Sequence, residues 1–142
     1  MTQGQGSAFE MELDPAQVAL ATRLSKELID CDPSILSLIV VDSLGRVLHV
    51  GRSARLEESE QVSPELVRVF GTVSRLIVGA ANNAAQIMGG TEAIVGIFKR
   101  EKALLINLPE YNLLLALRLS RSANAEYVCG VIRDLLATQP EQ

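Results

Sequence analysis

The longest amphipathic stretch of the chain runs from about residue 66 to 88 and is predicted to be a helix. At about 100° per residue its large apolar side chains share one face, the pattern of a helix that packs on a core. This predicted core face comprises Leu66, Val69, Phe70, Val73, Leu76, Ile77, Ala80, Ala84, Ile87 and Met88. Arginines and asparagines interrupt the stretch, so we do not expect it to cross a bilayer.

A second stripe, of small or β-branched side chains, follows the flank of the same helix. Its members are spaced alternately by four and three residues, and small residues at that spacing let a second helix approach closely. The stripe comprises Val67, Gly71, Ser74, Val78, Ala81 and Ala85. Either a partner chain or the polar segment 51–63 covers the stripe, or it is simply tolerated surface.

Two further helices are predicted, one near each end of the chain. Asp14 suits an N-cap and Pro15 suits the first helical turn, so the first helix starts here. Its apolar stripe comprises Val18, Ala21, Leu24 and Leu28. The last helix lies within residues 122–139, and its inward positions are expected to be Tyr127, Val131, Leu135 and Val128.

Short β-branched and leucine-rich runs fill the rest of the chain. "ILSLIVVD" and "RVLHV" flank a turn from Asp42 to Arg46 and predict a hairpin, and three more runs between residues 91 and 121 predict a meander. Apolar residues on both faces of the meander strands imply that both faces are covered. The prediction is an α+β domain over residues 13–138, with tails at 1–12 and 139–142. Its five-stranded antiparallel sheet carries helices on both faces, in the order α-β-β-α-β-β-β-α.

Composition narrows the classes of function. The chain is 48% hydrophobic and only 21% charged, so part of its apolar surface is expected to be covered by a partner. A net charge of −4 without a Lys/Arg cluster argues against nucleic acid and against anionic lipid. No secretory signal or spanning segment is present, so we expect a soluble, cytoplasmic protein in which Cys31 and Cys129 are thiols.

The sequence offers little chemistry. It has no phosphate-binding P-loop, and His49 is its only histidine, so no catalytic site, metal site or cofactor is expected. The middle helix also carries a polar stripe that includes Arg68 and Arg75. These arginines are either its solvated edge or candidate contacts to a partner, where a guanidinium can bind carboxylates or carbonyls.

The element order, the stretch "LIVVDSLGRVL" and the stretch "AIVGIFKREKALLINL" resemble the Roadblock/LC7 family over about residues 14–137. The resemblance implies a non-enzymatic scaffold or regulator that binds a Ras-like small GTPase or a larger complex. It also implies a homodimer that pairs through the middle helix and the third strand, so that the sheet continues across two chains. The expected interface comprises Val67, Gly71, Ser74, Val78, Ala81, Asn82, Ala85, Ile94, Gly96 and Phe98. The alternative is a small-molecule sensor of PAS, GAF or profilin-like type.

Overall fold

The computed structural model describes residues 12–54 and 63–138. The described residues form an α+β fold with a five-stranded antiparallel sheet, in the predicted order of helices and strands. The α-helices and strands are α2 (Pro15–Leu28), β1 (Ile35–Asp42), β2 (Val47–Arg52), α3 (Pro64–Ala84), β3 (Ala93–Ile97), β4 (Glu101–Leu108), β5 (Leu113–Ser120) and α4 (Ala125–Ala137). Two short 3-10 turns, η2 (Gln86–Met88) and η3 (Pro109–Tyr111), follow α3 and β4.

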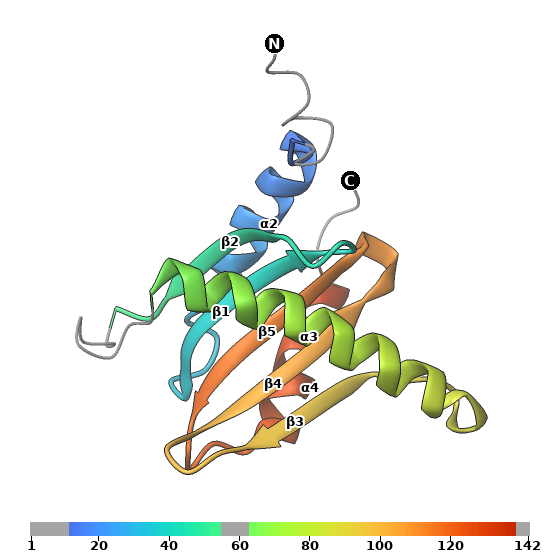
Figure 1. Ribbon diagram of the computed structural model, residues 1–142. Coiled ribbons are helices and arrows are strands. Elements are labelled where there is room, and N and C mark those ends of the chain that lie inside the picture. The colour runs from blue at the N-terminus through green and yellow to red at the C-terminus, as the bar shows by residue number, and fades with distance from the viewer. Residues whose placement is uncertain (1–11, 55–62, 139–142) are drawn as a thin grey trace.

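The strands lie in the order β2-β1-β5-β4-β3, so β2 and β3 form the two edges of the sheet. Helix α3 crosses one face diagonally, whereas α2 and α4 cover the other (Figure 1). Helices therefore lie on both faces, as predicted. The C-terminal part of α3 extends beyond the β3 edge and has no strand beneath it (Figure 1).

Strand β5 shows why both faces need cover. Its odd-numbered leucines, from Leu113 to Leu119, point into a core shared with α2 and α4. Its even-numbered residues Leu114 and Ala116 point into a second core under α3. All of these side chains are at most 1% exposed, so this central strand is apolar on both faces.

The predicted turns and caps are confirmed. The Asp14 carboxylate accepts a hydrogen bond from the Ala16 N–H at 3.0 Å, as the predicted N-cap should. The Ser63 hydroxyl accepts the Leu66 N–H at 3.3 Å and caps α3. In the β1–β2 turn, Asp42 Oδ1 accepts the backbone N–H groups of residues 44 and 46, both at 2.9 Å. Gly45 has a φ of +86°, a left-handed conformation that favours glycine at this position of the turn.

Helix α3 packs with the opposite face from the one predicted. The buried residues of α3 are Val67, Gly71, Ser74 and Val78, the stripe expected to meet a partner. The predicted core face is wrong, because most of its large side chains are exposed: Leu66 59%, Val69 57%, Val73 41%, Leu76 67% and Ile77 44%. The small side chains allow the helix backbone to lie close to the strands, so they face the sheet.

Helix α4 also differs in part from the prediction. Tyr127 was expected to point inward but is 62% exposed, whereas Val128 and Ile132 are buried. Of the expected inward positions, Val128 is buried and Leu135 packs against the core, so the prediction is right in part. The buried positions of α4 are Ala125, Val128 and Ile132. Cys31 and Cys129 are both free, half-buried thiols, as predicted.

Candidate interaction surface

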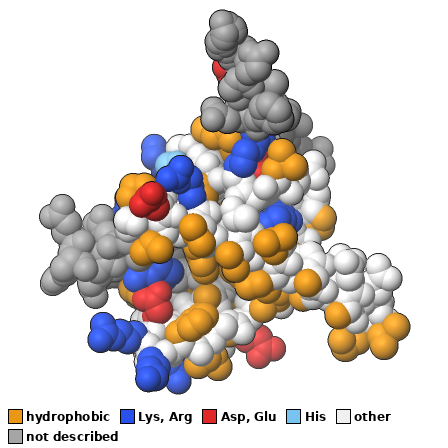
Figure 2. All heavy atoms as spheres, in the orientation of Figure 1, with side chains coloured by type: hydrophobic (Ala, Val, Ile, Leu, Met, Phe, Trp, Pro, Cys, Tyr) orange, Lys and Arg blue, Asp and Glu red, His pale blue; other side chains and the backbone are white. Residues whose placement is uncertain are grey.

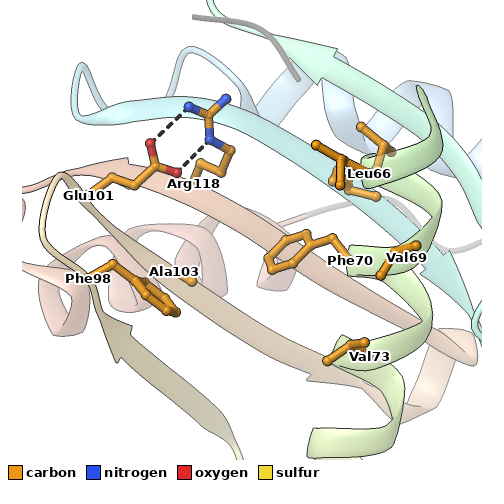
Figure 3. A pocket seen from close by; sticks show the side chains of 10 residues that line it. Leu66, Val69, Phe70, Val73, Phe98, Glu101, Ala103 and Arg118 are labelled. Carbon is orange, nitrogen blue, oxygen red and sulfur yellow. Dashed lines mark hydrogen bonds and ion pairs between the residues drawn. The ribbon is translucent and has the colours of Figure 1, made fainter. Parts of the chain in front are cut away.

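An apolar groove of about 540 Å³ separates α3 from the end of the sheet that carries the β3–β4 turn. Phe70 of α3 and Phe98 of the turn point toward each other across the groove, and Ala103 of β4 lies between them (Figure 3). The groove exists because α3 crosses the sheet diagonally and leaves this corner of the face uncovered (Figure 1). A partner side chain could therefore enter it without displacing the helix.

An ion pair closes one end of the groove. Arg118 Nε donates to Glu101 Oε2 at 2.6 Å, and Nη2 donates to Oε1 at 2.8 Å (Figure 3). This two-point geometry orients both side chains and satisfies both carboxylate oxygens. The polar groups of the groove are thus paired with each other.

Exposed apolar side chains continue from the groove along α3 and onto β3 (Figure 2). We call this the α3–β3 apolar surface. It comprises Leu66, Val69, Val73, Leu76, Ile77, Ile87, Met88 and Phe98, each at least 41% exposed. Val95 and Ile97 are also exposed, but they alternate with Ile94 and lie on the opposite face of β3, the face that α4 covers. A contiguous apolar area of this kind is uncommon on a monomeric protein and usually marks a contact with another molecule.

The outer edge of β3 is open. Phe98 N–H donates to the Glu101 carbonyl at 3.0 Å, and Asn107 N–H donates to the Glu92 carbonyl at 3.4 Å, so residues 92 and 98 turn their backbone groups toward β4. Because hydrogen bonding alternates along an antiparallel strand, Ala93, Val95 and Ile97 turn theirs away from β4. In the described chain no strand lies on that side, so this edge can accept another strand.

Solved structures share the fold of this chain, although no family model and no curated protein matches the sequence. The structure of a Roadblock/LC7 domain from Streptomyces avermitilis is 14% identical with a TM-score of 0.64, over 82% of this chain and 91% of that one. This chain has a Roadblock/LC7-type fold. A structure of MglB with a tetrameric arrangement is 16% identical with a TM-score of 0.65, over 88% and 90%. The gliding protein MglB from Thermus thermophilus is 15% identical with a TM-score of 0.63, over 89% and 96%.

Within this Roadblock/LC7-type fold, four of the expected interface residues are covered by their own chain. These four residues lie between α3 and the sheet: Val67, Ser74 and Val78 are at most 5% exposed, and Gly71 is buried with them. They cannot contact a partner unless α3 leaves the sheet. The large side chains on the flank of α3 are the ones available instead.

The other expected interface residues lie nearer the open edge. Ala81 and Ala85 are half-buried, and Asn82 Oδ1 accepts the Thr91 N–H at 2.9 Å, which ties the end of α3 to the start of β3. Ile94 packs against the core beneath α3. Gly96 lies under the ring of Phe98, since a Cβ there would be 2.9 Å from Phe98 Cε2.

The two candidate arginines have different surroundings. Arg68 is exposed beside the N-terminal turns of α3. Arg75 is half-buried: its Nε donates to the Asp42 carbonyl at 3.2 Å and its Nη1 to Asn107 Oδ1 at 3.4 Å. Burial lowers the pKa of Arg75, with a smaller opposing effect from the Asp42 carboxylate. Arg75 therefore attaches α3 to the β1–β2 turn, and only Arg68 is available to a partner.

The described residues hold no group of three His, Cys, Asp or Glu side chains that could bind a metal ion. His49 Nδ1 lies 3.4 Å from Thr22 Oγ1, and burial lowers the pKa of the imidazole. Burial also raises the pKa of both cysteine thiols. Among the described residues, no helix is long and apolar enough to cross a membrane.

Proposed function

We propose that this chain is a non-enzymatic regulatory module that works as a homodimer and binds a Ras-like small GTPase or a subunit of a larger complex. The observation that carries the proposal is the α3–β3 apolar surface, which runs beside an open strand edge. The GTPase is the partner class that the Roadblock/LC7 resemblance implies. The likeness to MglB structures, one of them tetrameric, supports self-association.

The shape of α3 supports pairing of two copies across β3. An antiparallel pairing of the two β3 edges creates a two-fold axis perpendicular to the sheet. The part of α3 that extends beyond β3 would then lie over the sheet of the second copy (Figure 1). It would cover the corner that the α3 helix of the second copy leaves uncovered. Each groove would be filled by the other chain, and two antiparallel α3 helices would cover the continuous sheet.

The side chains on the flank of α3 fit such a contact. At helical spacing Phe70, Val73 and Ile77 follow one another on the side of α3 that faces the groove. Further along, the same flank continues with alanines at 80 and 84, which would allow close approach at the overhang. Of the residues first expected at the interface, Ala81, Asn82, Ala85, Ile94, Gly96 and Phe98 remain in the proposal.

Regulation without catalysis agrees with the chemistry of the described residues. Their one histidine is half-buried beside Thr22. On the candidate surface, Glu101 and Arg118 form an ion pair and neutralise each other. Such a surface can recognise a partner but offers no activated nucleophile or base. Among the arginines of α3, Arg68 is the one proposed to contact the partner.

A small-molecule sensor is the second candidate, because the groove has the size of a ligand pocket. A ligand site also needs free polar groups that orient the ligand. Here Glu101 and Arg118 bind each other, and the remaining lining is apolar. The groove therefore fits an apolar partner side chain better than a polar metabolite.

The proposal is tested by affinity capture from native lysate with GTP or GDP added, together with the mass of the purified protein in solution. Nucleotide-dependent recovery of a Ras-like GTPase on a dimeric bait is the expected result. A monomeric bait that carries a small metabolite would support the sensor instead. An Arg68→Ala bait should recover less GTPase than the wild type while remaining dimeric.

A further inference from the structure

One end of the sheet collects positive charge. At this end β1 begins and β2 and β5 end, because Ser37 near the start of β1 pairs with Arg52 of β2 and Arg118 of β5. The β3–β4 turn lies at the same end, because Glu101 pairs with Ser120 at the end of β5. Lys and Arg side chains gather over this turn (Figure 2). Of the chain's 13 Lys and Arg residues, six belong to this end: Arg52, Lys99, Arg100, Lys102, Arg118 and Arg121.

Two of the six have structural partners. Arg118 binds Glu101 through two hydrogen bonds, and Lys102 Nζ donates to the Ala123 carbonyl at 2.6 Å. The other four, Arg52, Lys99, Arg100 and Arg121, are exposed, and none of the three ion pairs between described residues involves them. We call these four the basic sheet end.

This end also holds acidic residues, since Asp30 and Asp32 precede β1 and Glu126 lies in the first turn of α4. Its exposed cations are concentrated at Lys99 and Arg100 of the β3–β4 turn and at Arg121, which follows the residue that pairs with Glu101. Like charges held close together cost free energy, and an acidic surface that meets them is attracted and oriented. We propose that the basic sheet end is the docking site of an acidic segment of a partner protein. The inference does not depend on the proposed homodimer, because the four side chains lie outside the α3–β3 apolar surface.

A protein segment fits this end better than a bilayer. Stable attachment to a membrane needs an apolar anchor as well as cations, with the anchor pointing outward beside them. The nearest aromatic side chain, Phe98, is folded back over Gly96 and points into the groove (Figure 3). Ile97 is the other exposed apolar side chain next to these cations, and a single isoleucine is a small anchor for a bilayer. The cations therefore fit an acidic chain better, because it supplies its own matching charges.

The test uses a short fluorescent polyglutamate peptide and the full-length protein. We expect the peptide to bind at low salt and to dissociate as salt is raised, because exposed charges are screened. Backbone amide chemical shifts should change around Lys99, Arg100 and Arg121. The Lys99→Ala/Arg100→Ala variant should raise the Kd about tenfold. The control, Arg46→Gln/Arg133→Gln, removes the same charge at the other end of the sheet, in the β1–β2 turn and beside the start of β3, and should leave the Kd nearly unchanged.

Four results would overturn the proposal. The first is a Kd for the peptide that rises equally in both double variants. The second is amide chemical shifts that change only on other surfaces of the protein. The third is a protein that binds phosphatidylserine vesicles but not the peptide. The fourth concerns the chain's own acidic residues Glu57, Glu58 and Glu60, which follow Arg52 in the sequence. If the wild type fails to bind the peptide while a variant with glutamine at these three positions binds it, the acidic occupant is this chain itself.

Discussion

Gly71 of α3 lies directly against Val47 of β2: a Cβ on Gly71 would come to 2.9 Å from Val47 Cγ2, closer than real Cβ atoms approach their neighbours. The same glycine also faces the Gly45 carbonyl of the β1–β2 turn. One turn further along α3, Arg75 donates to the Asp42 carbonyl. The position of α3 on the sheet therefore depends on the absence of a side chain at residue 71.

We expect Gly71→Ala to destabilise the fold by about 1 kcal/mol in urea denaturation. Alanine favours a helix over glycine by about 1 kcal/mol, but overpacking a buried contact costs about 1 to 3 kcal/mol, and the second effect is larger here. Gly79 in the same helix is the matched control, since nothing lies within 4 Å of a Cβ there. Gly79→Ala should stabilise the protein. A stabilising Gly71→Ala would show that α3 does not rest on Val47.

A second close approach joins α2 to the edge strand β2. A Cβ on Gly51 would overlap the Ser25 hydroxyl oxygen but would lie 3.6 Å from Ser25 Cβ, so only the hydroxyl is in the way. We expect Gly51→Ala to lower the free energy of unfolding by about 1 to 2 kcal/mol. Adding Ser25→Ala should recover most of that loss in thermal unfolding. Strictly additive effects of the two substitutions would argue against this contact.

The sequence predicts the order of helices and strands, and that helices cover both faces of the sheet, because apolar periodicity and turn residues determine the structure of neighbouring residues. It does not decide which stripe of α3 faces the sheet, since hydrophobic burial alone favours the larger side chains of Leu66 and Leu76. The strands beneath α3 carry the branched side chains of Val41 and Val47, which leave no room for a side chain at Gly71. That fit depends on residues that are distant in the sequence, so a local pattern cannot predict it. The basic sheet end could not be predicted for the same reason, because its cations come from separate segments of the chain.

His49 predicts a dependence of stability on pH. Burial lowers the pKa of its imidazole in the folded protein, so the unfolded chain binds a proton more readily. Its contribution to stability is complete above the unfolded pKa of about 6.5 and is lost as pH falls through the lower folded value. The slope of unfolding free energy against pH should be shallower in His49→Gln. An unchanged slope below pH 6.5 would assign the acid sensitivity to carboxylates.

The proposed dimer makes Ile77 the most informative position on α3. Its side chain is 44% exposed in the single chain and lies on the flank that faces the groove, so Ile77→Asp should leave each chain folded. In a dimer the same aspartate would be buried without a partner, which costs several kcal/mol and should give monomers in sedimentation at micromolar concentration.

Gln86→Asp, at the exposed start of η2 just after α3, is the matched control and should stay dimeric. Gly71→Glu cannot serve, because it would displace α3 from its own sheet. A monomeric wild type would refute the dimer itself. If the Ile77→Asp variant stays dimeric, the dimer must form through another face of α3.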